Sequence, residues 1–281
     1  MHTAYPPIPK KPADTLRVVS INVNGLRAAA KKGLIEFLTS SDFDVVCLQE
    51  TRLTEAQWSD ALRPTGWHTA LFPAQKAGYA GTAIYSRLPF VAKRGLDFDL
   101  ADNEGRFLCG EFDLSTYGHT APLFIASLYL PSGSSGEPAQ ARKDTFLAQF
   151  RTILADWRAQ NKSIIICGDY NIVHKRIDIK NWSGNQKASG CLPHERAWLD
   201  YLYDTLGYVD SFRQVRPDSH VYSWWSNRGQ ARANNVGWRI DYQAVSPDVA
   251  SATTGAWVYR EQWFSDHAPV IVDYAIAKLV Q

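Results

Sequence analysis

The sequence predicts an α/β protein whose core is two sheets flanked by helices. Short apolar runs typical of strands outnumber the helical patterns, and the two kinds of element do not alternate strictly, as they would in a doubly wound fold. With 281 residues, of which 45% are hydrophobic, the chain can bury a sizeable core. We expect residues 1–15, which are rich in proline and polar residues, to be a flexible leader, and residues 16–281 to form a single domain.

The first half of the chain contains most of the predicted strands. Residues 16–22 (LRVVSIN) form the first, and apolar residues at helical spacing predict a helix over residues 25–38. The run FDVVCLQ at residues 43–49 is almost wholly apolar, as expected of a strand covered on both faces. Three further strands are predicted, at residues 81–86, 105–114 and 123–130.

The second half begins with a long predicted helix at residues 138–160. A buried strand follows at residues 162–167 and ends at Gly168. Proline in the first turn, with Glu195 close behind, predicts a helix over residues 193–206. Two late strands are predicted, at residues 239–245 and 268–274.

Composition argues against several classes of protein. No stretch approaches 18 consecutive apolar residues, so no membrane span is predicted, and the N-terminus lacks the apolar core of an export signal, which favours the cytoplasm. The four cysteines form no CxxC pair and mostly lie in apolar runs, so they are predicted to be reduced structural thiols rather than zinc ligands. The net charge of +2 is only a weak indication of a nucleic-acid partner, because the distribution of charge matters more than its sum.

Polar residues recur at the ends of the predicted strands. Any one of them alone is more often a turn, cap or solvated residue. Their recurrence indicates a site, because loops that carry function converge at strand ends. The residues are Asn22 after VVSI, Glu50 after VVCLQ, Asp169 and Asn171 after IIICG, Asp241 after GWRI, and Asp266 and His267 before APVIVDY.

These residue types suit phosphodiester hydrolysis assisted by a metal ion. Oxygen ligands without thiols favour a hard cation such as Mg²⁺ or Mn²⁺. An aspartate with a nearby asparagine can hold and deprotonate an attacking water, and a histidine supported by an aspartate can contact a phosphate oxygen. The chain has neither the G-x-S-x-G elbow of a serine hydrolase nor a Walker A loop.

Ten sequence blocks, in order over residues 16–274, resemble the exonuclease III family of apurinic/apyrimidinic endonucleases, in the endonuclease/exonuclease/phosphatase superfamily. The resemblance implies a four-layered α/β sandwich with two mainly antiparallel central sheets flanked by helices. It also implies a magnesium-dependent exodeoxyribonuclease III or class II apurinic/apyrimidinic (AP) endonuclease. The blocks are SINVNGLRA, CLQET, GTAIYS, EGRF, LYLPSGS, CGDYNI, DIKNWSGNQKASG, LPHER, YSWWSNRGQARANNVGWRIDY and FSDHAPV.

The resemblance also implies roles for individual residues. Glu50 resembles the principal metal ligand, with Asn22 beside it, and Asp266 resembles a residue on the metal or leaving-group side. Further members of the predicted metal site are Asp169, Asn171 and His267. Asp169 resembles the group that activates water, helped by Asn171; His267, oriented by Asp241, resembles the imidazole that contacts the scissile phosphate; and Tyr129 resembles the phenol on the phosphate side.

The expected DNA contacts combine this resemblance with positive charge. Asn185 resembles a backbone contact, while Trp224, Trp238 and Ile240 match an apolar pocket that accepts an extruded baseless sugar. Strand alternation points Trp224 and Trp225 in opposite directions without saying which faces the site, and the resemblance selects Trp224. The basic candidates for phosphate contact, each of which has surface solubility as an alternative role, are Lys31, Lys32, Arg52, Lys76, Lys187, Arg228 and Arg232.

The chain departs from the family pattern at several positions. Asn24 stands where some members carry aspartate, which removes a carboxylate from any second metal site. Ser132 and Ala188 replace amides and so lose possible phosphate hydrogen bonds. His174 and Lys175 lie where bulk could restrict an abasic sugar or favour a DNA end.

The implied function is hydrolysis of the DNA backbone 5′ to abasic sites, with 3′-phosphodiesterase, 3′-phosphatase and 3′–5′ exonuclease activity on duplex DNA. The expected cofactor is Mg²⁺, with Mn²⁺ able to substitute. The expected partner is double-stranded DNA with abasic sites or blocked 3′ ends, bound by a monomer. One alternative is a general nuclease or a phosphatase acting on lipids or inositol phosphates, against which the GWRIDY block and the Trp224/Trp238 pair argue. The other is a DNA-binding protein without catalysis, which would not need the whole polar set.

Overall fold

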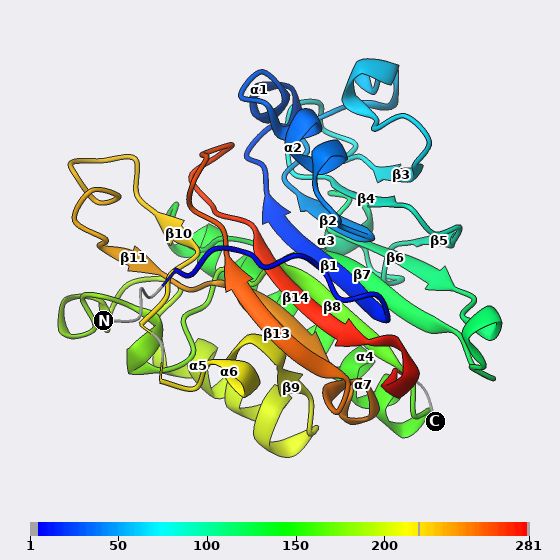
Figure 1. Cartoon of the computed structure of the whole chain (residues 1–281). Coiled ribbons are helices and arrows are strands. Elements are labelled where there is room, and N and C mark those ends of the chain that lie inside the picture. Colours follow the sequence, from blue (N-terminus) through cyan, green and yellow to red (C-terminus); the bar gives the residue numbers. More distant parts are fainter. Residues whose placement is uncertain (1–4, 219, 280–281) are drawn as a thin grey trace.

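Two six-stranded sheets lie face to face, and helices cover both outer faces (Figure 1). The computed structural model describes residues 5–218 and 220–279, so residues 1–4 of the predicted leader lie outside the described part. The four layers confirm the predicted α/β sandwich with two mainly antiparallel central sheets.

The first sheet has the strand order β13-β14-β1-β2-β4-β3. Its strands β1 and β2 are parallel, and every other pair in it is antiparallel. The strands are β1 (Thr15–Asn22), β2 (Val45–Gln49), β3 (His68–Phe72), β4 (Thr82–Ser86), β13 (Thr253–Val258) and β14 (Val270–Ala275).

The second sheet, in the order β5-β6-β7-β8-β12-β9, follows the same plan. Here β7 and β8 form the one parallel pair. A two-stranded ribbon of β10 (Trp224–Trp225) and β11 (Gly237–Trp238) stands apart from both sheets. The six strands are β5 (Val91–Arg94), β6 (Phe107–Phe112), β7 (Leu123–Tyr129), β8 (Ile164–Asp169), β9 (Val209–Asp210) and β12 (Asp241–Val245).

Seven α-helices accompany the sheets in the described residues, and none of those described is long and apolar enough to cross a membrane. They are α1 (Leu26–Ala30), α2 (Leu34–Ser40), α3 (Asp99–Asp102), α4 (Glu137–Ala159), α5 (Pro193–Asp200), α6 (Ser211–Val215) and α7 (Pro247–Ala250). A π-helical turn, Tyr201–Thr205, continues α5. Single 3₁₀ turns span Glu55–Gln57, Asp60–Leu62, Ser115–Tyr117, Arg176–Asp178, Ser183–Asn185 and Ile276–Lys278.

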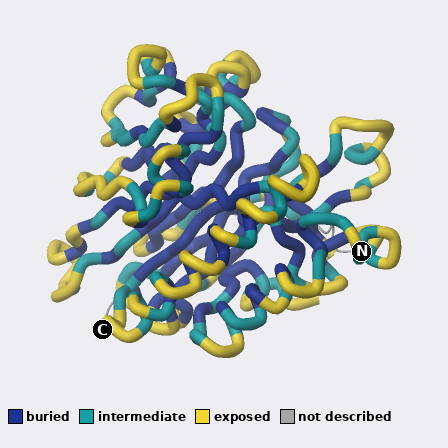
Figure 2. Tube along the Cα trace, turned by 180° about the vertical axis from the view of Figure 1, so that it is seen from behind, coloured by how far each residue is buried: buried dark blue, intermediate teal, exposed yellow. Residues whose placement is uncertain are grey.

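The main core lies between the sheets, where Val18 and Val45 of the first belong to one apolar cluster with Ile125 and Ile165 of the second. Helices α1 and α2 bury Leu26 and other apolar residues on the outer face of the first sheet, and α4 and α5 cover the second. Figure 2 shows the resulting pattern, with buried segments at the centre of the molecule and exposed segments around them. Such burial of apolar surface is the main stabilising contribution to a sandwich of this kind.

Three features of the fold differ from the sequence prediction. The helix expected over residues 25–38 is two helices, because Gly33 between them has φ 87°, a left-handed conformation that ends a helix. The helix predicted to reach residue 206 is regular only to Asp200. The prediction had no counterpart for strands β3, β5, β9, β10, β11 and β13 or for the short helices α3, α6 and α7. Strand β5 is exposed along its whole length and so lacks the apolar pattern of a buried strand.

The predicted leader ends one residue too late, because Thr15 begins β1; residues 5–14 have no regular secondary structure beyond a turn, yet they contact the domain. Lys11 forms an ion pair with Asp44 at 2.5 Å. The Tyr5 hydroxyl accepts a hydrogen bond from the Tyr222 backbone N–H at 2.9 Å and donates to the Asn235 side chain at 3.2 Å. These contacts connect residues 5–11 to the segment before β2, to the segment before β10 and to the loop between β10 and β11.

A buried ion-pair network joins the segment after Asn171 to the start of β12. The Asp178 carboxylate, which is 1% exposed, accepts a hydrogen bond from Arg239 at 2.7 Å and forms an ion pair with Arg213. Arg239 also donates to Asp210 at 2.7 Å. Burial alone would raise the pKa of Asp178, but the two guanidinium groups lower it to about 2.

Replacing Asp178 with asparagine is expected to lower the free energy of unfolding at pH 7 by about 3 kcal/mol, because buried Arg239 loses a carboxylate partner. The folded-state pKa of Asp178 lies below its ordinary value of 3.8, so its stabilisation is present above pH 4 and is lost as pH falls towards 2. The difference between wild type and Asp178→Asn should therefore shrink over that range. Urea unfolding at each pH measures it, with exposed Asp60→Asn as the control. A difference that stays constant down to pH 2 would contradict the assignment.

Candidate active site

The strand ends that carry the predicted polar residues meet at one end of the sandwich. Asn22 ends β1, Glu50 follows β2, and Asp169 ends β8. The Asn22 side-chain amide donates to Glu50 Oε1 and to Asp169 Oδ2, both at 2.9 Å, so a single amide connects the two sheets. Tyr129 and Asp241, on the strands that flank β8, are both register partners of Asp169.

A pocket of about 630 Å³ opens at this end. Asn22 and Asp241 do not line it but are fully buried and contact residues that do. The lining residues are Asn24, Glu50, Arg52, Tyr129, Ser132, Gly133, Ser134, Gly136, Asp169, Asn171, Ala188, Ser189, Trp224, Trp238, Ile240, Asp266 and His267.

A larger hollow, of about 840 Å³, lies between residues 7–11 and the end of α2. Two of the carboxylates that line it, Asp42 and Asp44, already pair with Arg17 and Lys11. The smaller pocket, which collects the carboxylates, histidine and tyrosine of several strand ends, is therefore the candidate active site.

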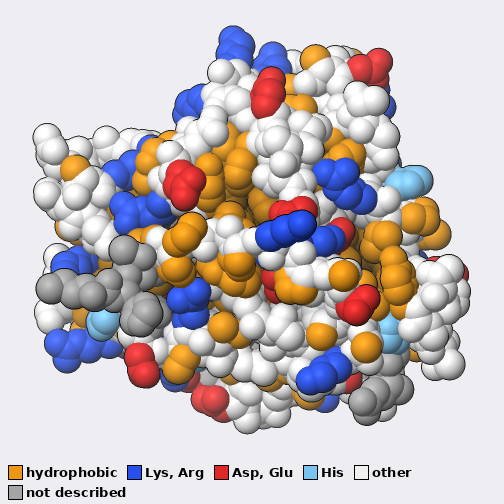
Figure 3. Space-filling model, in the orientation of Figure 1, with side chains coloured by type: hydrophobic (Ala, Val, Ile, Leu, Met, Phe, Trp, Pro, Cys, Tyr) orange, Lys and Arg blue, Asp and Glu red, His pale blue; other side chains and the backbone are white. Residues whose placement is uncertain are grey.

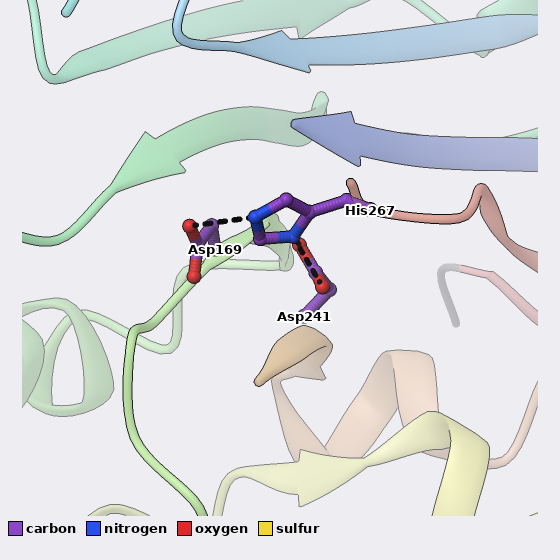
Figure 4. Close-up of side chains that lie close together, drawn as sticks. All are labelled: Asp169, Asp241 and His267. Carbon is purple, nitrogen blue, oxygen red and sulfur yellow. Dashed lines mark hydrogen bonds and ion pairs between the residues drawn. The ribbon is translucent and has the colours of Figure 1, made fainter. Parts of the chain in front are cut away.

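Asp169, Asp241 and His267 form the buried centre of the site (Figure 4). The His267 Nδ1 lies 3.0 Å from Asp241 Oδ2, and Nε2 lies 3.8 Å from Asp169 Oδ2, beyond hydrogen-bond distance. Ser223 donates to Asp241 Oδ2 at 2.5 Å and so fixes that carboxylate. The hydrogen bond at Nδ1 thereby orients the imidazole ring, while Nε2 points towards Asp169 (Figure 4).

The three groups set one another's charge. Burial alone would lower the pKa of His267, but the carboxylates of Asp241 and Asp169 raise it to about 10, so the ring is an imidazolium at neutral pH. Burial raises the pKa of Asp169 to about 7, with His267 opposing the rise and Asp241 adding to it. The centre therefore combines a positively charged donor, His267, with a carboxylate, Asp169, whose pKa lies near neutral pH.

Glu50 and Asp266 lie on the pocket side of this centre. Arg52 forms an ion pair with Glu50 Oε2 at 2.5 Å, a partner the sequence prediction did not give it. Asp266 accepts hydrogen bonds from the Asn24 side-chain amide at 2.8 Å and from the Trp224 indole at 3.1 Å. Burial would raise the pKa of Asp266, but His267 and these two donors lower it, so the carboxylate stays ionised.

The backbone is strained around the pocket. Asn24, Glu50, Arg52 and Asn171 all have φ between 46° and 52°, the left-handed region that side chains disfavour. They are half of the eight described residues other than glycine with positive φ. Such conformations cost free energy and concentrate at functional sites, where the surrounding structure holds them in place.

The donor set fits a hard divalent cation. The carboxylates of Glu50 and Asp266 line the pocket together with amide and hydroxyl groups, and no cysteine lines it. A second possible set is Asp169, Asp241 and His267, whose ligand atoms lie within 4.8 Å of one another. The Nδ1 of His267 is already paired with Asp241, and an imidazolium has no lone pair for a metal, so Glu50 and Asp266 are the better ligands.

One wall of the pocket is apolar and aromatic. The Trp224 and Trp238 rings meet edge to face, with centroids 5.9 Å apart and an interplanar angle of 89°. Ile240 completes the wall. Trp225 instead is 0% exposed in the core between the sheets, so strand alternation does separate the two neighbouring tryptophans and Trp224 is the one that faces the pocket.

Tyr129 is held by Arg106, a residue for which no role was predicted. The buried Arg106 guanidinium lies 4.7 Å from the centroid of the Tyr129 ring and donates to its carbonyl oxygen at 3.0 Å. Burial raises the pKa of the Tyr129 phenol well above its ordinary value, and the neighbouring Glu50 adds to this. The phenol is therefore a neutral O–H donor. Arg106 stands in the EGRF block, which was the only signal available.

The remaining DNA-contact candidates lie outside the pocket. The Asn185 side chain donates to the Asn181 carbonyl at 2.6 Å, and exposed Lys187 precedes the pocket residues Ala188 and Ser189. Arg228 is exposed in the loop between β10 and β11. Figure 3 shows Lys and Arg side chains gathered around the end of the molecule that carries this ribbon.

His174 and Lys175 do not line the pocket. Both side chains turn to Asp200, with His174 Nε2 at 2.9 Å from its carboxylate, and the His174 ring also packs against Tyr203. Because the Asp200 carboxylate holds both side chains, their bulk does not narrow the pocket in this structure.

Comparison with known proteins finds similarity along most of the chain. A model described as the endonuclease/exonuclease/phosphatase family matches residues 19–267. An exodeoxyribonuclease of Bacillus subtilis is 36% identical over 262 residues, covering 91% of this chain and 98% of that protein. The DNA repair nuclease APEX1 of Danio rerio is 31% identical over 269 residues, covering 94% and 84%. The crystal structure of an AP endonuclease from Leishmania major superposes with a TM-score of 0.81 at 27% identity, covering 97% of this chain and 93% of that one.

Proposed function

The chain belongs to the endonuclease/exonuclease/phosphatase family, and from that membership we propose that it is a DNA repair phosphodiesterase that cuts the backbone of duplex DNA 5′ to abasic sites. The observation that carries the proposal is one pocket that holds a carboxylate of raised pKa, an imidazolium and an edge-to-face tryptophan pair. The relatives named above are nucleases, which supports DNA as the substrate.

Asp169 is the proposed general base, and Asn171 orients the water. The Asp169 carboxylate accepts the Asn171 backbone N–H at 2.9 Å and the Asn22 amide at 2.9 Å, so its position is fixed before substrate binds. The Asn171 side chain donates to the Leu130 carbonyl at 2.9 Å, which fixes its own orientation. A base works best with a pKa near the working pH, and burial brings Asp169 there. The water loses its proton to Asp169 as its oxygen attacks phosphorus. The bond from phosphorus to the 3′ oxygen breaks, and that oxygen takes up a proton from solvent to give the 3′-hydroxyl.

His267 and Tyr129 are proposed to hold the scissile phosphate. His267 is positively charged and fixed through Nδ1 by Asp241, so its Nε2–H can donate to a non-bridging phosphate oxygen. The neutral Tyr129 phenol, at the end of β7, supplies a second donor. Donors placed in advance stabilise the charge that develops on these oxygens in the transition state, where it counts most.

The metal ion is proposed to be Mg²⁺, with Mn²⁺ able to substitute. Glu50 and Asp266 would hold it, and when bound it would supply Lewis-acid stabilisation of the phosphate and leaving oxygen. Both polar atoms of the Asn22 side chain already bond within the protein, to Glu50, Asp169 and the Asn24 backbone, so its part is to orient Glu50. Asn24 similarly orients Asp266 through the hydrogen bond that its amide donates.

Abasic specificity is proposed to rest on the wall of Trp224, Trp238 and Ile240. A sugar without a base can leave the helix at a lower cost and fit a narrow apolar slot that a complete nucleotide cannot enter. Asn185, Lys187 and Arg228 are proposed to contact backbone phosphates on either side of the pocket. The same phosphate site supports 3′-phosphodiesterase, 3′-phosphatase and 3′–5′ exonuclease activity at duplex ends.

We further propose that the protein acts as a cytoplasmic monomer. All the pocket residues come from one chain, so no second copy is needed to complete the site. The four cysteines are unpaired and buried, as suits a reducing compartment. Sedimentation of the pure protein tests whether it is a monomer.

The substrate test compares two labelled duplexes that differ only in one tetrahydrofuran abasic analogue. We expect cleavage immediately 5′ to the analogue, leaving a 3′-hydroxyl, and little internal cutting of the intact duplex. Equal internal cutting of both duplexes would indicate a general nuclease. Binding without cleavage of either would indicate a DNA-binding protein.

Removal of divalent cations is expected to abolish cleavage. Reactions with excess EDTA should fall to background, and Mg²⁺ or Mn²⁺ added back should restore the rate, because the carboxylates of Glu50 and Asp266 offer a site for a hard cation. Cleavage that continues at the full rate in EDTA would remove the cation from the mechanism.

A further inference from the structure

A buried ion pair that the proposed chemistry does not use lies behind the pocket. Lys143 of α4 and Glu195 of α5 are both 0% exposed, and the Lys143 ammonium lies 2.5 Å from Glu195 Oε1. Taking two charges out of water is costly, and an apolar pair of similar volume is often at least as stable. Stability alone therefore does not explain why this ion pair is buried here.

The ammonium of Lys143 also holds the residue proposed to orient the water. It donates to the backbone carbonyl of Asn171 at 2.8 Å. On the other side, the Asn171 N–H donates to Asp169. Asn171 has φ 51°, a strained conformation that persists only if its neighbours hold it. Lys143 is the charged donor that holds the carbonyl side of this residue.

Glu195 extends the same connection to the loop on the far side of the pocket. Its Oε2 accepts the backbone N–H groups of Gly190 and Leu192 at 2.7 and 3.0 Å. The Gly190 carbonyl in turn accepts the Val173 N–H at 2.7 Å. Ala188 and Ser189, which precede Gly190, line the pocket. The ion pair thus joins the Asn171 segment to the loop that contains Ala188 and Ser189.

Gly190 shows how closely the two segments fit. Its φ is 88°, and a Cβ added there would lie 2.9 Å from the Asn171 carbonyl oxygen and 3.1 Å from the Trp238 ring. Small shifts of either segment would therefore move both Asn171 and the aromatic wall. A misplacement of about 1 Å in a catalytic group can cost about 10²-fold in rate.

We propose that Lys143, held by Glu195, is a positioning residue for cleavage: it fixes the Asn171 carbonyl, and through it the Asn171 and Asp169 side chains, at the geometry that attack on phosphorus requires. The inference rests on the proposed function, because it assigns Asn171 to the water. Lys143 does not line the pocket.

The test is the double variant Lys143→Met/Glu195→Gln. It removes both charges together, and the glutamine oxygen can still accept from Gly190 and Leu192. We expect kcat on the abasic duplex to fall by about 10- to 100-fold with KM nearly unchanged, because water placement is lost and DNA contacts are kept. In the single variant Glu195→Gln, the glutamine oxygen can still accept a hydrogen bond from Lys143. This variant should therefore show a smaller loss of kcat than the double variant.

The matched control is Arg17→Met/Asp273→Asn. This pair is equally buried, with Arg17 Nε 2.7 Å from Asp273 Oδ1, and joins β1 to β14 without contacting the pocket. Thermal melts of both double variants show whether they are folded at the assay temperature, and the control should keep the wild-type kcat.

The outcomes separate the inference from the proposed function. If wild type does not cut the abasic duplex, the proposed function fails. If wild type cuts and Lys143→Met/Glu195→Gln keeps the wild-type kcat, with or without a higher KM, the positioning role is overturned while the function stands. A control that loses kcat as strongly also overturns it, because the effect would then be general destabilisation. Should the double variant not fold, Glu195→Gln decides: an unchanged kcat overturns the proposal, and a reduced kcat supports it.

Discussion

Asp169→Asn is expected to lower kcat on an abasic duplex by about 10³- to 10⁴-fold while duplex affinity stays within a few-fold of wild type. The amide keeps the size of the carboxylate, so the pocket retains its shape. It cannot accept a proton from water, because it lacks the carboxylate whose pKa burial brings to about 7.

Loss of the charge also changes the neighbours of Asp169. The carboxylate contributes to the raised pKa of His267, but Asp241 contributes more, so the imidazolium should persist in the variant. The phosphate donors are then intact, and the expected loss belongs to the base alone.

Single-turnover cleavage with enzyme in excess measures this loss without interference from product release, and fluorescence anisotropy with the same duplex measures binding. Exposed Asp248→Asn, at the start of α7, is the matched control and should cut at the wild-type rate. If Asp169→Asn also cut at that rate, the general base would have to be sought elsewhere. If it lost binding and cleavage together, Asp169 would be a structural residue.

Asp241→Asn is expected to lower kcat by about 10²- to 10⁴-fold through His267. Asp241 is the largest of the charges that raise the pKa of His267, and it accepts from Nδ1 at 3.0 Å. Without its charge the imidazolium is less favoured, and an asparagine that presents its N–H₂ group would select the wrong tautomer. The scissile phosphate would then lose its charged donor.

Ser223→Ala provides a graded comparison for Asp241→Asn. Ser223 donates to Asp241 at 2.5 Å and does not line the pocket, so its removal should loosen the carboxylate while keeping its charge. We expect a loss of about tenfold or less, of the size of one misaligned hydrogen bond. A full loss in Ser223→Ala combined with full activity in Asp241→Asn would contradict the proposed chain of contacts from Ser223 to His267.

The main strands and the polar residues at their ends could be predicted because both signals are local. An apolar run such as residues 43–49 indicates a buried strand whatever it pairs with. The side chains after these runs collected into one pocket, with Asn22 and Asp241 directly behind it. Strand β5 was not predicted because it lies exposed at the edge of its sheet and therefore carries no apolar pattern.

The contacts that tune the site could not be predicted, because they join residues far apart in the chain. Arg52 was expected to contact DNA, yet it pairs with Glu50. Ser223 carries no charge and gave no signal before its hydroxyl was seen to bond to Asp241. Glu195 was predicted only as a residue of a helix start, a position it does occupy in α5, while its partner Lys143 lies 52 residues away.

The sequence by itself therefore determined which residues are buried in strands, which polar groups stand at the strand ends and which chemistry those groups can perform, since each depends on residue type and short-range pattern. Only the tertiary structure decided which charges neutralise one another, which tryptophan faces the pocket and which buried groups hold the catalytic residues in place. These depend on distances across two sheets, and electrostatic and hydrogen-bond energies change steeply over a few ångströms.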